Sequence, residues 1–178
     1  MTMLTAGLAL LMAAAAPPAA PEIHCKGHED NLATYQAISK ILFNDRDASR
    51  AGEFYADEFI SHNSDLGGSE KMVSNPANMT RMWNKSLEED PNRELIDNLI
   101  ICKDDFVIAQ VTLQGDRAGE TLKGKPEGRQ RFRASAIDMY RFKDGKVIER
   151  WGNADLVAII RQIGLPVDMT IKPLPPED

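Results

Sequence analysis

The sequence is short of positive charge. Its 21 Lys and Arg are outnumbered by 27 Asp and Glu, which gives a formal net charge of -6 over 178 residues. Nucleic acids and anionic membranes select electropositive surfaces, so this balance argues against both as partners. The length fits one domain, and 43% hydrophobic residues are enough to bury a core. We therefore expect a soluble globular domain with no nucleic-acid partner.

Cysteine is also scarce, with Cys25 and Cys102 the only two in the chain. In an oxidising compartment they could form one disulfide that ties the N-terminal segment to a strand, but two free thiols fit the sequence equally well. His24 and His28 flank Cys25 at an irregular spacing that does not favour a metal site. The glycines between residues 115 and 128 do not follow the spacing of a phosphate-binding loop. We expect no dedicated metal site and no nucleotide-binding loop.

Long hydrophobic runs are missing except at the N-terminus. Residues 1–20 hold no charged side chain and are mostly apolar from Leu4 to Ala16, before small residues and prolines. This pattern is typical of a secretory signal peptide, and the apolar run is too short for a confident membrane span. The alternative is a disordered or helical extension. We predict a signal peptide over residues 1–21, a secreted or periplasmic protein, and no stable membrane insertion after processing.

The clearest local signal is a β-hairpin around Asp144-Gly145, because this dipeptide favours the positive φ angles of a type I′ turn. With a two-residue turn, cross-strand neighbours share a face, so Tyr140 pairs with Glu149 and Asp138 pairs with Trp151. The predicted inner face is largely apolar and carries Phe132, Ala134, Ala136, Asp138, Tyr140, Phe142, Val147, Glu149 and Trp151. The predicted outer face is arginine-rich and carries Arg131, Arg133, Ser135, Ile137, Met139, Arg141, Ile148 and Arg150. Two acids, Asp138 and Glu149, are thus expected inside, where a charge is costly unless it is paired or used.

Helical patterns flank the strands. Apolar spacing predicts a helix from Asp30, and a short second helix is expected near Asp47. Asn75-Pro76 has the form of a helix cap followed by proline at the first helical position, and Pro91 ends that run. The final helix begins near residues 153–155 and ends at Gly164.

Four β-patterned runs complete the domain, over residues 94–102, 106–113, 129–142 and 146–151. Helices first, then an antiparallel sheet and a closing helix, indicate an α+β domain. We divide the mature chain into an N-terminal segment at 22–29, one domain at 30–165, and an exposed tail at 166–178.

Three stretches carry a family resemblance. The hairpin run from Asp138 to Trp151 with the following helix, the aromatic segment from Phe54 to Asn63, and the loop over residues 119–129 together resemble the SnoaL-like polyketide cyclase family, within the nuclear transport factor two-like superfamily. The resemblance covers roughly residues 30–165. It implies a curved antiparallel sheet wrapped by N-terminal helices into a cone, a central cavity, a C-terminal helix after the last strand, and a homodimer across the outer sheet face.

The resemblance also implies a chemistry. In this family an aspartate in the strand before the hairpin acts as general acid and base for an intramolecular aldol closure without a cofactor, and the match is Asp138. A carboxyl whose pKa is raised by burial can take and return a proton. We assign the second catalytic role, hydrogen bonding to the substrate's carbonyl oxygen, to His62, with Tyr140 as the alternative. Expected substrate-binding residues are Trp83, Tyr140, Trp151, Asn63 and Met79.

Other interpretations stay open. Asp138 can be a buried structural acid paired with His62 or an arginine, Glu149 can be a solvated ion-pair partner, and the helix residues Met79 and Trp83 can be core. The sequence departs from the family pattern at Gly152, where an acid is frequent, and around residues 116–117. We therefore weigh a cofactor-free lyase or isomerase acting on a carbonyl-bearing apolar small molecule against a non-catalytic ligand-binding module or a dimeric scaffold.

Overall fold

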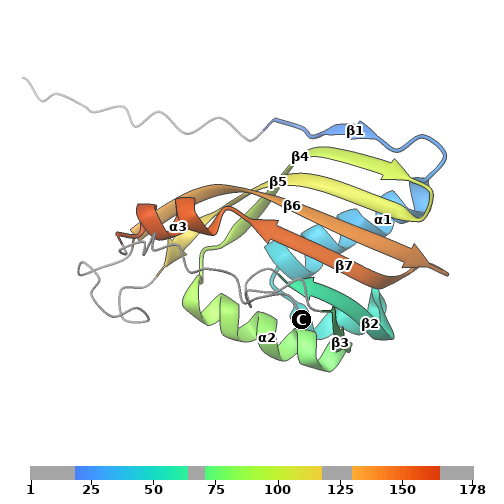
Figure 1. Ribbon diagram of the computed structural model, residues 1–178, viewed down its shortest axis with the longest axis horizontal. Coiled ribbons are helices and arrows are strands. Elements are labelled where there is room, and N and C mark those ends of the chain that lie inside the picture. Colours follow the sequence, from blue (N-terminus) through green and yellow to red (C-terminus); the bar gives the residue numbers. More distant parts are fainter. Residues whose placement is uncertain (1–18, 64–70, 118–129, 165–178) are drawn as a thin grey trace, which may run out of the picture.

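The computed structural model describes residues 19–63, 71–117 and 130–164 (Figure 1). The predicted signal peptide, the loop over residues 119–129 and the predicted C-terminal tail fall wholly or almost wholly outside these ranges. Within them, no helix is both long and apolar enough to cross a membrane.

Strands in the described residues form one curved sheet in the order β1-β4-β5-β6-β7-β2-β3. Most neighbours are antiparallel, while β1 pairs with β4 and β2 with β7 in parallel. The strands are β1 (Glu22–His24), β2 (Tyr55–Asn63), β3 (Lys71–Ser74), β4 (Glu94–Lys103), β5 (Phe106–Arg117), β6 (Gln130–Lys143) and β7 (Lys146–Ala154). The α+β class and the curved sheet are confirmed, whereas β1, β2 and β3 had no counterpart among the predicted strands.

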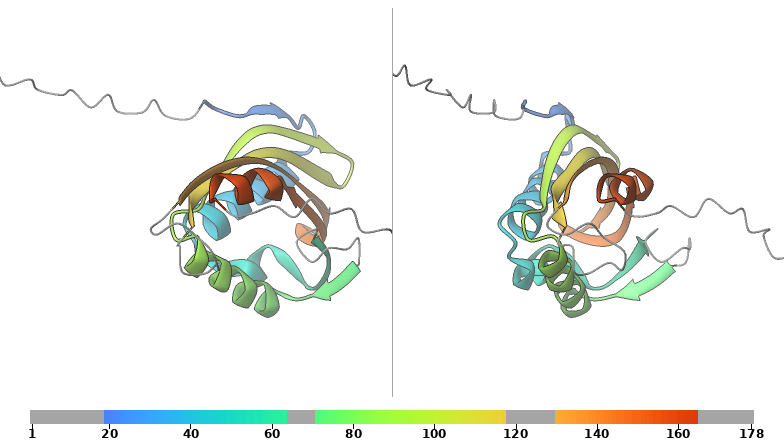
Figure 2. Two further views of the ribbon diagram at one scale, coloured as in Figure 1. Left: turned by 60° about the vertical axis from the view of Figure 1, so that its left-hand side comes forward. Right: turned by 90° about the vertical axis from the view of Figure 1, so that its left-hand side faces the viewer.

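Helical segments cover the concave side of the sheet (Figure 2). They are α1 (Glu29–Ala37), the π-helical η1 (Ile38–Asn44), the 3₁₀-helical η2 (Ala48–Glu53), α2 (Pro76–Glu89) and α3 (Leu156–Gln162). Tyr35, Ile38 and Leu42 are fully buried against the sheet and anchor α1 and η1 in the core. The predicted cap of α2 is confirmed, since Asn75 Oδ1 accepts a hydrogen bond from Asn78 N at 2.8 Å.

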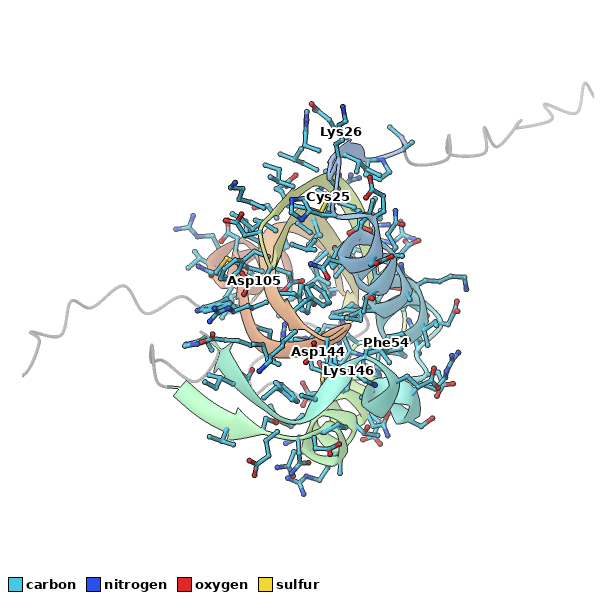
Figure 3. The ribbon with its side chains drawn as sticks, turned by 90° about the vertical axis from the view of Figure 1, so that its right-hand side faces the viewer. Cys25, Lys26, Phe54, Asp105, Asp144 and Lys146 are labelled. Carbon is cyan, nitrogen blue, oxygen red and sulfur yellow. A yellow bond between two sulfur atoms is a disulfide. The ribbon has the colours of Figure 1, made fainter. Side chains whose placement is uncertain are left out.

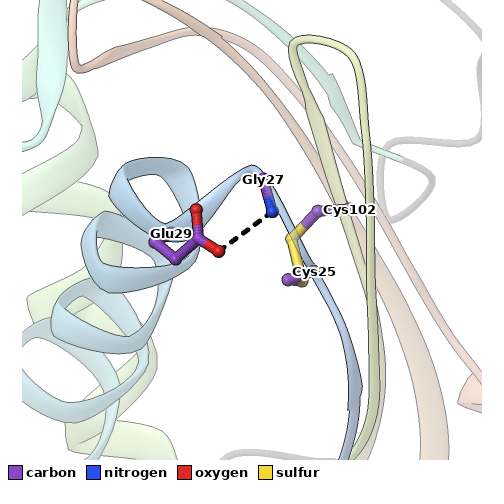
Figure 4. Close-up of a disulfide and its surroundings, with 4 residues drawn as sticks. All are labelled: Cys25, Gly27, Glu29 and Cys102. Atoms are coloured by element: carbon purple, nitrogen blue, oxygen red, sulfur yellow. Dashed lines mark hydrogen bonds between the residues drawn. A yellow bond between two sulfur atoms is a disulfide. The ribbon is translucent and has the colours of Figure 1, made fainter.

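A disulfide joins Cys25, just after β1, to Cys102 on β4, with their Cα atoms 4.6 Å apart (Figure 4). Of the two alternatives left open by the sequence, the structure therefore has the cross-link. Beside it, Gly27 takes a positive φ and its N–H donates to the Glu29 carboxylate at 2.9 Å, which begins α1. The N-terminal segment is thus fixed to the sheet edge on one side and to α1 on the other.

The hairpin between β6 and β7 forms as predicted at its turn and differs beyond it. Asp144 and Gly145 both have positive φ, and Phe142 pairs with Val147. Figure 3 looks at this end of the sheet, where Lys146 and Phe54 lie close together, and Val147 N donates to Phe54 O at 2.8 Å.

A bulge then shifts the register by one residue, because Arg141 pairs with Glu149 and leaves Ile148 without a partner on β6. The predicted pairs of Tyr140 with Glu149 and of Asp138 with Trp151 are therefore wrong.

The bulge exchanges the two faces of β7. A shift of one residue moves every later side chain to the opposite face. Tyr140 now pairs with Arg150 and Asp138 with Gly152, so Arg150 turns inward while Glu149 and Trp151 turn outward. Val147 is nevertheless fully buried beside Phe142. The bulge keeps this apolar pair in the core and still brings an arginine to the concave face.

Candidate functional site

A cavity of about 640 Å³ lies between α2 and the concave face of the sheet. Its walls are mainly apolar and include Phe43, Phe59, Met79, Trp83, Val111 and Leu113. Charged side chains also reach it, namely Lys85, Glu89, Arg93, Asp138 and Arg150. Ligand pockets in proteins typically combine such apolar walls with a few polar groups, at volumes of roughly 300–1,000 Å³. The cavity is the candidate functional site.

Asp138 is the buried acid of this cavity. It lies on the concave face of β6, only 7% exposed, and its Oδ1 accepts a hydrogen bond from Arg150 Nη2 at 3.2 Å. Within the described residues no hydrogen bond reaches Oδ2. Burial raises the pKa of Asp138, and the charge and hydrogen bond of Arg150 oppose that rise. Asp138 therefore has one oxygen held by a cation and one without a donor.

Gly152 makes room for this ion pair. It faces Asp138 across the hairpin, and a Cβ at this position would lie 2.8 Å from Arg150 Nη2 and 2.9 Å from Asp138 Oδ1. Such approaches are shorter than van der Waals contact, so any side chain at 152 would displace one of the two charged groups. The departure from the family pattern at Gly152 is thus a condition for the Asp138–Arg150 pair.

Tyr140 lies behind the cavity wall. It is 1% exposed, its ring centre is 5.5 Å from that of Tyr35, and Arg150 stacks over it at 5.9 Å. It is not among the residues that line the cavity. Burial raises the pKa of Tyr140 well above its ordinary value and that of Tyr55 to about 12. These phenols therefore stay protonated and uncharged at physiological pH, and they enclose the inner side of Arg150.

A half-buried carboxyl, Asp97, has no counterpart among the predicted site residues. Its side chain accepts hydrogen bonds from Tyr35 Oη and, at 3.2 Å, from Ser39 Oγ. Burial raises the pKa of Asp97, and these two hydrogen bonds oppose the rise. The register of β4 shifts directly after Asp97, so simple strand alternation could not place it. It is not part of the cavity lining.

His62 and Trp151 lie on the other face of the sheet from Asp138. Ser61, not His62, lines the cavity on β2, because neighbouring strand residues point to opposite faces. His62 Nε2 is 2.9 Å from Glu149 Oε1, and its ring stacks on Trp151 at 4.7 Å. The expectation that His62 and Trp151 share the cavity with Asp138 is therefore wrong. The bulge in β7 moves Trp151 to the convex face, and on β2 Ser61 rather than His62 points to the concave face.

Met79 and Trp83 do line the cavity, from α2. Trp83 Nε1 donates to Leu42 O at 2.9 Å, and its ring packs edge-on against Phe43 at 4.2 Å. Their role in substrate binding remains a prediction. The side chain of Asn63 lies outside the described part of the chain, so that expectation is not tested.

No group of three or more His, Cys, Asp or Glu side chains in the described ranges is placed to hold a metal ion.

The comparisons with known proteins agree with this architecture. The family model for the SnoaL-like polyketide cyclase matches residues 32–163. Among solved structures, IdmH of Streptomyces antibioticus, named as a candidate polyketide cyclase, is 19% identical, with a TM-score of 0.65 over 76% of this chain and 99% of its own. A candidate SnoaL-like polyketide cyclase from Jannaschia sp. CCS1 is 20% identical, with a TM-score of 0.66 over 78% of this chain and 94% of its own.

A third solved structure, AclR of Streptomyces galilaeus, is named as a candidate hydroxylase. It is 22% identical, with a TM-score of 0.64 over 78% of this chain and 98% of its own. No curated protein matches the sequence. At these identities the solved structures support the fold alone, and their names span more than one chemistry.

Proposed function

The chain belongs to the SnoaL-like polyketide cyclase family, and on that premise we propose that it is a cofactor-free lyase or isomerase acting on a carbonyl-bearing, largely apolar small molecule. The observation that carries this proposal is the position of Asp138, a buried acid on the wall of a mostly apolar cavity of about 640 Å³. Asp138 is the group that moves the proton.

The proposed mechanism divides the work between Asp138 and Arg150. Asp138 takes the proton from the carbon α to the substrate's carbonyl, and a hydrogen bond from Arg150 stabilises the enolate oxygen as charge develops. In a cyclisation, the enolate carbon then attacks a second carbonyl carbon of the same molecule. The protonated Asp138 returns its proton to the new alkoxide, so no proton is gained or lost. Arg150 thus takes the role that the sequence had suggested for His62 or Tyr140.

Deuterium exchange tests the proton transfer directly. Phenylacetone, a neutral ketone with an acidic α-carbon, is incubated with the mature protein in D₂O, and exchange above the uncatalysed rate is followed by proton NMR. We expect exchange with the natural sequence and its loss in Asp138→Asn. Glu149→Gln is the matched control, because Glu149 is an ion-paired acid of similar exposure on the opposite face. Equal exchange in Asp138→Asn and the natural sequence would overturn the mechanism.

The second candidate is a ligand-binding module without chemistry. The Asp138–Arg150 ion pair favours it, because a carboxylate held by a cation can serve structure alone. Carbonyl ligands that bind but never exchange would support this alternative over the enzyme. A scaffold with a cavity filled by its own side chains is disfavoured by the volume of the cavity.

We also propose export. Supporting observations are the apolar, uncharged run at residues 4–16 and the Cys25–Cys102 disulfide, since such bonds persist mainly in oxidising compartments. Expression with the natural N-terminus should give a periplasmic protein that begins between residues 17 and 22, as read by intact mass. An unprocessed cytosolic chain would contradict the proposal.

A homodimer across the outer sheet face is the third part of the proposal. One cross-strand row of this face carries Ile101, Ile108, Met139 and Trp151, and the neighbouring Ile137 is 54% exposed. An apolar face of this kind is suited to an isologous interface. Ile137→Glu is expected to convert a dimer into a monomer in light scattering, whereas a natural sequence that is already monomeric would refute the dimer.

A further inference from the structure

Two buried serine side chains belong to the cavity wall and have not been assigned a role. Ser61 on β2 is 6% exposed and Ser74 on β3 is 5% exposed, and both line the cavity. Within the described ranges neither hydroxyl has a hydrogen-bond partner. Neither oxygen is fully enclosed by the protein. Both hydroxyls are therefore open to the cavity and free to bond a ligand.

The two serines lie close together on one face of the β2–β3 ladder. Ser61 pairs with Met72 and Ser74 pairs with Phe59, and all four side chains line the cavity. The serines are thus diagonal neighbours, whose Cα atoms are typically about 7–8 Å apart. A ligand oxygen between them needs to lie about 2.7–2.8 Å from each hydroxyl oxygen, a span that serine side chains can reach from this spacing. We call Ser61 and Ser74 the serine subsite.

A wholly apolar ligand would leave the serine subsite without partners. Water can bond to these hydroxyls in the free protein, but a ligand that fills the cavity displaces that water and loses affinity unless it replaces the hydrogen bonds. A serine hydroxyl both donates and accepts. A hydroxyl on the ligand fits such a pair best, because it can donate to one serine and accept from the other.

The serine subsite lies at a distance from the acid that moves the proton. Ser61 is the cross-strand neighbour of Arg150 on β7, and Asp138 is on β6, one strand further. Ser74 on β3 is three strand steps from Asp138, which corresponds to about 14 Å along the sheet at the usual spacing of strands. A single ligand reaches Asp138 and the serine subsite only if its hydroxyl is remote from its reactive carbon.

We propose that the serine subsite binds a hydroxyl at the far end of the substrate, so that the substrate is a hydroxy ketone with an apolar body between its two polar ends. This inference rests on the proposed function for the ketone end, and it adds the group that is recognised at the other end. Phe59, Met79 and Trp83 provide the apolar wall for the body of the ligand.

The experiment compares three neutral ketones on the mature, disulfide-bonded chain: phenylacetone, 4-hydroxyphenylacetone and 4-methylphenylacetone. The methyl probe has nearly the size of the hydroxyl probe but no hydrogen-bonding group at that end. We expect calorimetry to show that the hydroxyl probe binds at least about tenfold more tightly than the methyl probe. Ser61→Ala and Ser74→Ala should each lower this ratio, and the double variant should bring it to one or below.

Ser39→Ala is the matched control. Ser39 is equally buried at 5% exposure, but its Oγ already donates to Asp97 Oδ2 at 3.2 Å, and it does not line the cavity. We expect its ratio to match that of the natural sequence. Because each ratio is taken within one variant, a partly unfolded preparation does not alter it.

Three results would overturn the serine subsite. They are a hydroxyl probe that binds no better than the methyl probe, a preference that survives in the double variant, and a failure of all three probes to bind. The proposed function is decided separately by deuterium exchange into phenylacetone, which has no hydroxyl at its far end.

Discussion

The two faces of the β6–β7 hairpin carry similar pairs of side chains in different surroundings. On the concave face Asp138 pairs with Arg150, and on the convex face Glu149 pairs with His62. All four side chains are at most 15% exposed. Only the concave pair reaches the cavity, whereas the convex pair is covered by the stacked ring of Trp151. Burial and pairing alone therefore do not identify a functional site, and only the concave pair has access to the cavity.

The largest expected difference is in proton transfer. Asp138→Asn should lower exchange into phenylacetone by at least about 100-fold, which is typical for the loss of a general base. Glu149→Gln should leave the rate within about twofold, because its carboxylate lies on the other face. The two substitutions are isosteric and each leaves an arginine partner behind, Arg150 for Asp138 and Arg141 for Glu149, so the folded state of the two variants can be compared by circular dichroism. A similar loss of exchange in both variants would remove the distinction between the faces.

The next largest effect is expected at Gly152, which faces Asp138. Gly152→Ala adds a methyl group that would lie within 3 Å of both members of the ion pair. We expect a loss of about 1–3 kcal/mol in the free energy of unfolding, the usual cost of overpacking, together with slower exchange. Asn153→Ala is the control, since Asn153 is the exposed neighbour on the opposite face. Urea denaturation measures the free energy of unfolding of both variants. If that of Gly152→Ala is unchanged, the ion pair can move to accommodate the methyl group.

The pH dependence of exchange also distinguishes Asp138 on the concave face from Glu149 on the convex face. Because burial raises the pKa of Asp138, exchange should increase with pH through an apparent pKa above the ordinary aspartate value of about 3.9. Arg150→Gln removes a cation that opposes this rise, so its midpoint should move to higher pH, whereas Glu149→Gln should keep the natural midpoint.

The same shift has a consequence for stability. A carboxyl with a raised pKa in the folded state contributes stability below its unfolded pKa and loses it as pH rises through the folded pKa. The natural protein should therefore lose stability relative to Asp138→Asn as pH rises across that window, as measured by urea unfolding at several pH values. A pH-independent difference between the two proteins would contradict the raised pKa.

The sequence could predict those parts of the fold that depend on local patterns. The cap at Asn75, the turn at Asp144-Gly145 and the fold family all follow from short-range rules, and the structure has them. It could also identify Asp138 as the buried acid. The bulge at Ile148 could not be foreseen, because the alternation of β7 reads the same with or without an extra residue. That single residue decides whether Asp138 faces Trp151 or Gly152 and Arg150.

Contacts between residues on different secondary-structure elements could not be predicted from the sequence either. Tyr35 and Asp97 are 62 positions apart and join through the packing of α1 on β4, which no local pattern encodes. The predicted hairpin register put Arg150 on the arginine-rich face, and that face was expected outside because arginine is usually solvated. Its inward position is stabilised by Asp138 and enclosed by Tyr140, which both lie on the neighbouring strand β6 and face it only because of the bulge. Site geometry therefore depends on pairings that only the folded sheet supplies.

The smallest effect is expected on the convex face. His62→Phe keeps a ring to stack on Trp151 and removes the contact between Nε2 and Glu149 Oε1. We expect the free energy of unfolding to fall by only about 1 kcal/mol, the usual net value of one hydrogen bond, because Arg141 still lies 3.7 Å from the other carboxylate oxygen. His62→Gln can keep the hydrogen bond and loses the stacked ring, so the two variants separate the contributions. Exchange into phenylacetone should stay within about twofold in both, since neither touches the cavity. A tenfold or larger loss in either variant would mean that the convex cluster acts on Asp138 through the paired backbones of β6 and β7.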